Sequence, residues 1–503
     1  MAGARKLTAR GAFDATWSQD SRRLNWVLGN QLNTYATGSQ EAPEQRTIVL
    51  SRPAERARET IAFTGARILP MTDEDAVIEN GTILIRGNRI AAIGPAADIS
   101  IPADARRIDA AGKTIMPGLF DAHGHIDCCF GAGVMPVKQP TRYAALAFGI
   151  TANFDPYANE MTGYESAEMT NLGVLVGPRW LNAGQVAYGR AGKPDGPYEP
   201  LDSLEKARAY VARKVALGGP VIKSYKLMTR AQRQYLLHAA REAGVMVDAE
   251  GASFIADNIG MILDGHTNLE HNIPVAHYYA DLKGLLAASG MSHTPTLIVT
   301  FGELFGENYI YQTTKSWDHP KVVSFVPDVN YAYNPMAQAG EGSPLMRGSH
   351  TIHYADELYN IGWRSVGRSM VELDRMGVPI NVGSHGQAPG IAMHWEMRLL
   401  AEAGMPIMNV LRSATIVPAR TYGFDHALGT LEPGKLADLI VLDRNPLENI
   451  LNTDSVRYTI IDGRLYDAFS MDRLGSTAQK CSKFYWETDP KGPVDWKSAW
   501  EKK

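Results

Sequence analysis

Residues 229–251 read TRAQRQYLLHAAREAGVMVDAEG and hold one helix-like run followed by one strand-like run. In the first sixteen residues, apolar side chains recur three and four positions apart, which predicts a helix with one buried face. The short apolar run that follows is typical of a buried strand, and it leads to two acids, Asp248 and Glu250. We therefore predict a helix and then a strand that carries carboxylates at its end.

The same alternation extends on both sides of this unit, over about residues 117–425. Further strand-like runs beside amphipathic runs are PVIKSYKL (220–227), HTNLEHN (266–272), MSHTPTLIV (291–299) and VPINVGSHG (378–386). Repeated strand and helix units predict a parallel sheet, and about eight of them predict an α/β fold of the closed (β/α)8 TIM-barrel type. Active sites of such barrels lie at the C-terminal ends of the strands, so the polar residues there are the candidates.

Short β-type runs flank this middle region on both sides. ENGTILIRGNRIAAIGP (79–95) precedes it and GTLEPGKLADLIVLDRNP (429–446) follows it, each with turn signals such as Asn-Gly. We expect one small β-sheet domain built from residues 59–116 and 426–475, with the barrel inserted between them. Residues 1–58 are predicted to hold a β-hairpin at 16–36 and then a linker, and residues 476–503 form a C-terminal tail.

The composition excludes several classes of protein. Of the 503 residues 45% are hydrophobic and 21% are charged, which is typical of a soluble globular chain. The net charge of −4 argues against nucleic acid as a partner, and the lack of any run of about 18 apolar residues argues against a membrane span. Without a signal peptide we expect a cytoplasmic location, or a fragment of a longer, exported protein.

Polar residues cluster at the predicted strand ends. The stretch GLFDAHGHID (118–127) holds two histidines one residue apart, which lie on one face of a strand. The other strand ends supply a lysine, two acids and two more histidines. The full set is His123, His125, Lys223, Asp248, Glu250, His271 and His385. Burying an unpaired lysine or carboxylate costs several kcal/mol, and a shared metal site would satisfy the whole group.

These motifs resemble the amidohydrolase superfamily of metal-dependent hydrolases over about residues 60–470. The entry strand PGLFDAHGHID (117–127) and the exit GTLEPGKLADLIVLDRNP carry the broad resemblance, which is imidazolonepropionase-like. The phrases KSYKLMTRAQRQ (223–234) and VGSHGQAPGIAMHWEM (382–397) are similar to the branch in which this domain follows a TolB-like β-propeller. WSQDSRRLNWVLGNQLNTY (17–35) likewise resembles the last strands of such a propeller.

The resemblance implies that the flanking domain is a β-sandwich, and it implies a role for each residue of the set. His123, His125 and His271 would bind metal, and Lys223 would be a carboxylated lysine that bridges two ions, with Lys226 as the alternative. The fifth-strand histidine of the family is absent here, so Asp248 or Glu250 would take its place, and we favour Glu250 because it lies nearer the rim. Where the family has a catalytic aspartate this chain has His385, which would act as the base or bind one metal.

Zinc suits a nitrogen-rich ligand set, as one or two ions, and manganese or iron are the alternatives. Weaker site candidates are Asp248, His266, Tyr225, His293 and His394. Tyr225 shares a strand face with Lys223 and would donate to a substrate carbonyl or carboxylate, although a tyrosine in the core gives the same pattern. Asp155 would accept a hydrogen bond from a ligating histidine or cap a helix.

The expected reaction is hydrolysis of a C–N bond in an amide, a peptide or a cyclic amide. The alternatives are hydrolysis of an ester, a lactone or a phosphotriester at the same site, or a metal-free scaffold that keeps the barrel alone. The expected partner is a small-molecule substrate, and we expect a homo-oligomer because symmetric association is common among soluble proteins. Residues 185–203 and 301–350 are expected to form loops that choose the substrate, the second of them as an aromatic-rich lid.

Overall fold

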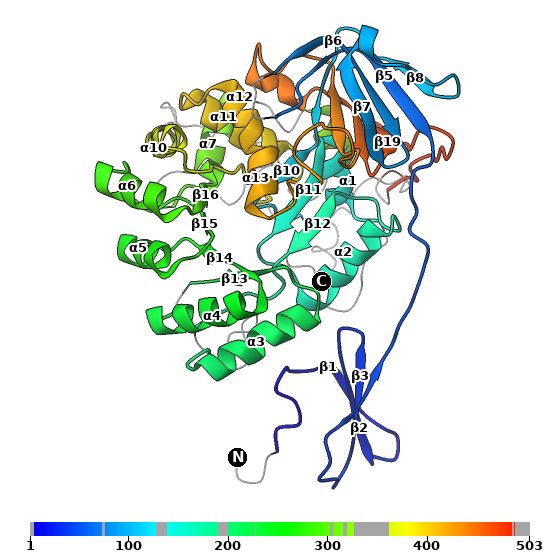
Figure 1. Cartoon of the computed structure of the whole chain (residues 1–503). Coiled ribbons are helices and arrows are strands. Elements are labelled where there is room, and N and C mark those ends of the chain that lie inside the picture. Colours follow the sequence, from blue (N-terminus) through cyan, green and yellow to red (C-terminus); the bar gives the residue numbers. More distant parts are fainter. Residues whose placement is uncertain are drawn as a thin grey trace, which may run out of the picture.

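The computed structural model has a mixed α/β fold in which helices lie along the outer side of parallel strands, and a mixed sheet of parallel and antiparallel strands covers one end (Figure 1). The structure describes residues 5–72, 76–126, 138–189, 200–226, 228–301, 305–314, 319–325, 362–484 and 487. Within these ranges no helix is long and apolar enough to cross a membrane. Cys128 and Cys129 lie outside the described residues, as does most of each predicted substrate loop.

Two parallel sheets form the centre of the chain. The first contains β10 (Leu119–Asp121), β11 (Ile150–Asp155) and β12 (Arg179–Asn182). The second contains β13 (Val221–Ser224), β14 (Met246–Glu250), β15 (Asn268–Glu270) and β16 (Ser292–Thr294). Nearly all residues of these strands are buried, as expected for parallel strands covered on both faces.

Backbone hydrogen bonds continue from one parallel sheet to the other. The Ala187 N–H donates to the Lys223 carbonyl at 2.8 Å, which joins the segment after β12 to β13. At the opposite side, an extended segment at 380–383 lies between β10 and β16. The Ala122 N–H, just after β10, donates to the Val382 carbonyl at 2.9 Å, and Ile380 pairs in parallel with His293 of β16. The C-terminal ends of β10, β14, β15 and this extended segment therefore lie close together.

Ten helices of the described chain surround these strands or close the C-terminal part of the region. They are α1 (Pro140–Ala147), α2 (Glu160–Asn171), α3 (Leu204–Ala216), α4 (Arg230–Ala243), α5 (Ile255–Asp264), α6 (Ala280–Ser289), α10 (Trp363–Arg375), α11 (Ile391–Glu402), α12 (Ile407–Ser413) and α13 (Ile416–Thr421). The predicted helix–strand unit at 229–251 is confirmed as α4 and β14. Thr229 and Gln232 form a reciprocal cap at the start of α4, and Gly244 ends it in a left-handed conformation.

An eight-stranded sheet combines the two flanking segments of the sequence. Its strands are β5 (Thr60–Ile68), β6 (Ile78–Arg86), β7 (Arg89–Pro95), β8 (Arg106–Asp109), β9 (Thr114–Pro117), β17 (Leu439–Leu442), β18 (Val456–Ile461) and β19 (Arg464–Asp467). The junction is the antiparallel pair of β9 and β17, in which Leu439 lies opposite Pro117. Apolar side chains from both segments, Phe63 and Val441 among them, share one core. Short 3₁₀ helices occur at η1 (Ala96–Asp98), η2 (Leu297–Val299) and η5 (Ile450–Asp454).

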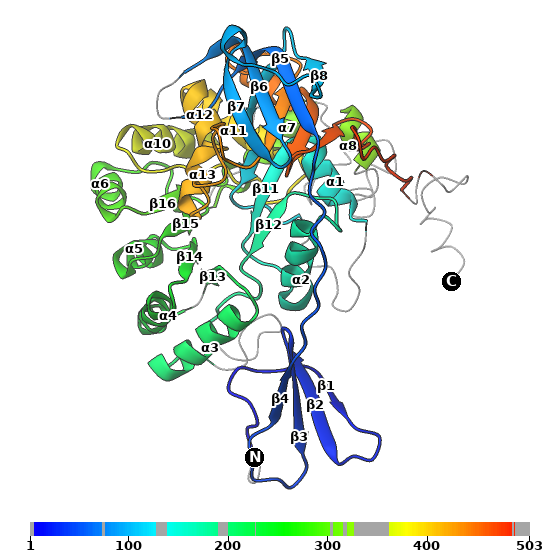
Figure 2. The ribbon, with the colours of Figure 1, turned by 45° about the vertical axis from the view of Figure 1, so that its right-hand side comes forward.

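The N-terminal strands form a separate antiparallel sheet of β1 (Phe13–Trp17), β2 (Arg23–Leu28), β3 (Gln31–Ala36) and β4 (Glu44–Thr47). Figures 1 and 2 show it set apart from the larger sheet and joined to it by an extended segment. Residues 16–36, predicted to form a hairpin around a turn at SQDS (18–21), contain two turns: that one joins β1 to β2, and a second at 29–30 joins β2 to β3. The prediction of a linker is wrong for β4, because Gln31 pairs with Thr47 and so adds a strand that turn residues alone do not reveal.

Two helices lie within the stretch 301–350, which is predicted to form an aromatic-rich lid loop. They are α7 (Gly306–Thr313) and α8 (Pro320–Phe325). The prediction of a loop is wrong for these residues, because burial of aromatic and aliphatic side chains such as Tyr311 and Val322 stabilises helix where sequence periodicity is weak.

Candidate metal centre

Three histidines from different strand ends meet at one point. His123 follows β10, His271 follows β15, and His385 follows the extended segment at 380–383. One ring nitrogen from each of them lies within 4.8 Å of the others. His125 joins the group, with its ring centroid 5.0 Å from those of His123 and His385. The sequence thus places these four imidazoles together because parallel strands end at a common rim.

The histidines of the His-X-His motif are held by carboxylates on their far sides. His123 contacts Glu270 through Nδ1, and His125 contacts the Asp155 Oδ1 through Nδ1 at 2.8 Å. When each Nδ1–H donates to its carboxylate, each Nε2 presents a lone pair. These two Nε2 atoms are 3.2 Å apart and so direct both lone pairs to one place. This is the arrangement of metal-binding imidazoles.

Burial favours the neutral form of these rings. Both His123 and His271 have a pKa well below the usual value, first because they are buried and then because other histidines and Lys223 lie near. A neutral imidazole is the form that binds a metal ion. The donor set, neutral nitrogens beside buried carboxylates, therefore fits a divalent cation.

His271 is fixed by a strained turn. Both His271 and Thr296 have a positive φ, 61° and 44°, a region that non-glycine residues rarely adopt. The Thr296 hydroxyl is hydrogen-bonded to the His271 Nδ1 at 2.8 Å. The buried Glu396 carboxylate accepts the Leu297 and Ile298 N–H groups at 2.7 and 2.9 Å, and so holds the 3₁₀ turn that begins after Thr296. Such strain is concentrated at functional sites.

His385 also has a positive φ, 55°, and its tautomer follows from its neighbours. The Gln387 side-chain N–H donates to the Glu307 carboxylate at 2.8 Å, which turns the Gln387 carbonyl toward the His385 Nδ1, 3.1 Å away. The Nδ1 of His385 therefore carries the proton, and Nε2 is the basic nitrogen.

The loop that carries His385 approaches β10 very closely. The His385 N–H donates to the His123 carbonyl at 2.6 Å, and Asp121 accepts the Ser384 N–H at 3.0 Å. A Cβ on Gly383 would lie 2.7 Å from the His123 Cβ, which is closer than side chains tolerate. A glycine is required at this position for the histidines to meet.

Gly383→Ala is expected to lower the free energy of unfolding by about 1–3 kcal/mol, the usual cost of overpacking, because the new methyl group displaces His123. Thermal unfolding checks this loss. The control is Gly284→Ala in α6, where an added Cβ meets nothing within 4 Å and a gain of up to about 1 kcal/mol is expected. Equal stability of the two variants would contradict the close approach.

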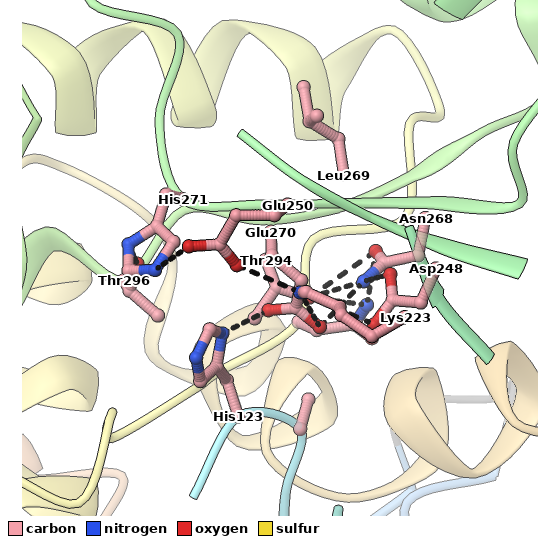
Figure 3. Close-up of polar contacts among 12 residues, drawn as sticks. His123, Lys223, Asp248, Glu250, Asn268, Leu269, Glu270, His271, Thr294 and Thr296 are labelled. Atoms are coloured by element: carbon pink, nitrogen blue, oxygen red, sulfur yellow. Dashed lines mark hydrogen bonds and ion pairs between the residues drawn. The ribbon is translucent and has the colours of Figure 1, made fainter. Parts of the chain in front are cut away.

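Lys223 lies to one side of His123 and His271, next to Asp248 (Figure 3), and it is only 1% exposed. Its Nζ is 3.1 Å from the Glu250 Oε2, 3.9 Å from the Asp248 Oδ2 and 4.0 Å from the Glu270 Oε1. Burial by itself would lower the pKa of Lys223, but the charges of Glu270, Asp248 and Glu250 outweigh it and raise that pKa. Burial and the neighbouring Asp248 raise the pKa of Glu270 well above its usual value.

The structure distinguishes Asp248 from Glu250, the two alternatives for the acid that replaces the fifth-strand histidine. The Glu250 Oε1 is 3.4 Å from the His271 Nε2, so this carboxylate reaches the histidines. Asp248 lies deeper, where its Oδ1 accepts the Asn268 side-chain N–H at 2.9 Å. Lys226, the alternative to Lys223, is 33% exposed and lies 3.8 Å from Glu250.

The weaker histidine candidates hydrogen-bond to backbone carbonyls instead. The Nδ1 atoms of His266 and His293 are 2.9 Å from the Met261 and Leu269 carbonyls, and the His394 Nε2 is 2.9 Å from the Phe148 carbonyl. Burial lowers the pKa of His266 and of His293 to about 4. The structure does not bring these three rings to the cluster. Tyr225 lies at its edge, half-buried, with its pKa raised to about 12 by burial.

Sequence reasoning missed five residues that support the histidine cluster. They are Asp121, Glu270, Thr296, Glu307 and Gln387. Glu270 could have been predicted from the sequence, because it lies at the end of a predicted strand, directly before His271. It also lies two residues after Asn268, so both side chains point to the same face of the strand, toward the inside. Thr296 could not have been predicted in this way, because its role depends on a positive φ.

Asp155→Asn is expected to weaken metal binding by about 10–100-fold, because an amide orients His125 less firmly and does not raise the basicity of its ring. Competition with a chromophoric chelator measures this affinity. Asp104→Asn removes an exposed charge and serves as the control. An unchanged affinity in Asp155→Asn would show that this carboxylate does not support a ligand.

Comparisons with known proteins agree with this geometry. A family model described as the amidohydrolase family matches residues 114–466. A 5-methylthioadenosine/S-adenosylhomocysteine deaminase of Symbiobacterium thermophilum is 23% identical over 454 residues, which cover 81% of this chain and 93% of the relative. Ochratoxinase of Aspergillus niger is 23% identical over 451 residues, which cover 81% of this chain and 85% of that one.

The solved structure of a Xaa-Pro dipeptidase with bound methionine has a similar fold. Its TM-score is 0.61 at 21% sequence identity, and the match covers 81% of this chain and 100% of that one. The family model spans well over half of the sequence and includes every strand end that supplies the histidine cluster. The chain therefore belongs to the amidohydrolase family.

Proposed function

We propose that this protein is a metal-dependent hydrolase that uses water to cleave a C–N bond in an amide, a peptide or a cyclic amide. The observation that carries the proposal is the pair of His123 and His125, whose Nε2 atoms lie 3.2 Å apart while their Nδ1 atoms contact Glu270 and Asp155. A structural pair of histidines has no need of two buried carboxylates that orient it.

The residues that would hold the metal are His123, His125, Glu250 and His271, with Lys223 as a further ligand in its carboxylated form. We propose zinc, because nitrogen donors dominate the set, with manganese or iron as alternatives. When bound, the ion would supply Lewis acidity that polarises the scissile carbonyl and acidifies water.

Formal charge links the state of Lys223 to the number of ions. A bound cation would favour ionisation of all three acids, Asp248, Glu250 and Glu270, although burial and Asp248 raise the pKa of Glu270 without it. With all three ionised, an ammonium at Lys223 leaves a net charge of −2, which one divalent cation balances. A carbamate at Lys223 gives a net charge of −4, which two divalent cations balance. We therefore propose that carboxylation of Lys223 and binding of a second ion occur together, because a buried excess charge of either sign is costly.

His385 would move the proton. Because Gln387 holds the proton of its ring on Nδ1, the Nε2 of His385 would accept a proton from the attacking water and return it to the leaving nitrogen. Glu307 contributes by fixing the orientation of the Gln387 amide. The same nitrogen would serve if His385 bound the metal instead.

Two similar proteins of low identity are named an ochratoxinase and a Xaa-Pro dipeptidase. These names favour amide and peptide bonds as the substrates of the present protein. The deaminase relative widens the class to C–N bonds of ring carbons. A homo-oligomer and a cytoplasmic location stay predictions.

We further propose that the two parallel sheets close into a (β/α)8 barrel spanning residues 117–425. Hydrogen bonds at both seams, from Ala187 to Lys223 and from Ala122 to Val382, support a closed ring. The flanking domain would comprise residues 59–116 and 426–475, whose strands share one sheet and one core. Residues 1–58 and 476–503 would be the N-terminal extension and the tail.

Metal removal tests the proposed function. Protein purified without chelator is expected to contain one or two transition-metal ions per chain by elemental analysis, two when bicarbonate is supplied. A panel of N-acyl amino acids and dipeptides should be hydrolysed by this protein, and treatment with a chelator should abolish that activity until metal returns. Protein that binds no stoichiometric metal would contradict the proposal and favour a scaffold.

A further inference from the structure

One cation at the rim of the metal centre has no strong partner. The Lys226 Nζ is 3.8 Å from the Glu250 Oε1, beyond hydrogen-bonding distance. Its other contacts are ring faces, with Nζ 4.6 Å from the ring centroid of Phe301 and 5.7 Å from that of Tyr225. In the described part of the chain, this ammonium therefore has three donors and no acceptor within hydrogen-bonding distance.

The contrast with Lys223 is instructive, because both lysines face Glu250. Lys223 is buried and lies 3.1 Å from the Glu250 Oε2, whereas Lys226 is one-third exposed. The Glu250 Oε1 is also 3.4 Å from the His271 Nε2. Glu250 thus lies nearer to Lys223 and His271 than to Lys226, and one-third of the Lys226 side chain stays exposed to solvent.

Lys226 lies close to the histidine cluster, with the Phe301 ring as the contact they share. The Phe301 ring lies stacked on the His271 ring, with centroids 4.0 Å apart, and Lys226 lies over the same Phe301 ring. The Tyr225 ring in turn contacts Tyr188 at 4.9 Å and Tyr157 at 6.4 Å between centroids. An aromatic wall with one ammonium at its edge therefore borders the histidine cluster.

We propose that Lys226 forms a subsite for a carboxylate of the substrate, a few bonds away from the C–N bond that is cleaved. This inference rests on the proposed function and narrows it to anionic amides such as N-acyl amino acids or dipeptides with a free carboxylate. A single ammonium between ring faces matches a monoanion with an apolar body, because the rings cover the apolar part and the ammonium meets the charge. The Tyr225 hydroxyl lies on the same wall and would donate a second hydrogen bond.

Binding of an acid and its neutral analogue tests the subsite without any cleavable bond. Metal-loaded protein is expected to bind 3-phenylpropanoate about tenfold more tightly than 3-phenylpropan-1-ol, as a charged hydrogen bond at a partly exposed site allows. In Lys226→Gln this ratio of dissociation constants should fall to about one, and in Lys226→Arg it should stay high. Lys206→Gln removes one positive charge on α3 and should keep the wild-type ratio.

A ratio that survives in Lys226→Gln would overturn the proposal, since the carboxylate would then bind elsewhere, for instance on the metal. The absence of any preference in the wild type would overturn it as well. Hydrolysis of N-benzoylglycine and N-benzoylglycinamide separates the two proposals. If neither compound is cleaved but the binding ratio depends on Lys226, the subsite holds and the hydrolase proposal loses support. If wild type and Lys226→Gln cleave N-benzoylglycine and N-benzoylglycinamide equally well, the hydrolase proposal holds and the carboxylate subsite at Lys226 is wrong.

Discussion

Replacing both His123 and His125 by alanine is expected to remove stoichiometric metal and to lower kcat/KM by about a thousandfold or more. The two Nε2 atoms are 3.2 Å apart and would be the paired donors to the metal, so their loss should leave no pair of nitrogens in that position. Losing the Lewis acid removes several kcal/mol of transition-state stabilisation, and each 1.4 kcal/mol is a factor of ten in rate. Elemental analysis and steady-state kinetics on the same preparation measure both effects.

The matched control is His238→Ala, which removes an exposed histidine on α4 that pairs with Glu242. This variant should keep the metal content and the activity of the wild type. A thermal unfolding curve shows whether the double variant still folds. If the folded double variant retained a full complement of metal, His123 and His125 would not be the ligands, and the proposed centre would be wrong.

His385→Asn is expected to lower kcat by about 10²–10⁴-fold, the usual contribution of a general base, while the metal content falls much less. The reason is that the Nε2 of His385 would carry the proton, whereas an asparagine amide has no basic nitrogen. The distinguishing measurement is the pH–rate profile, in which the limb that belongs to the base should disappear in the variant.

The structure makes the opposite outcome equally informative. One ring nitrogen of His385 lies within 4.8 Å of those of His123 and His271, so the same residue is placed to bind metal. If metal content and turnover fall in parallel, His385 is a ligand and another group is the base. His238→Asn, the same chemical change on the surface of α4, should alter neither quantity.

Much of the candidate site could be predicted because its residues occupy strand ends. His123, Lys223, Glu250 and His271 lie on or just after β10, β13, β14 and β15, and the strand pattern was readable from short apolar runs. The parallel arrangement of those strands then brings them to one rim. Glu270 was within reach of the same reasoning, since it ends β15 with its side chain inward.

The supporting residues could not be found in this way. Thr296 reaches His271 through a left-handed turn, and Glu396 holds that turn from α11, 98 residues after Ile298. No local periodicity encodes a contact of this kind. The identity of the acid beside the histidines likewise depends on depth, which places Glu250 next to His271 and Asp248 against Asn268.

The sequence by itself determined the alternation of helices and strands, the flanking β segments and the types of residue at the rim, because hydrophobic periodicity and strand-end chemistry are local properties. Only the tertiary structure decided which carboxylate orients each imidazole and which nitrogen of His385 is basic. Those choices depend on hydrogen bonds and burial between segments far apart in the chain, as between His123 and Glu270, and such contacts exist only after folding.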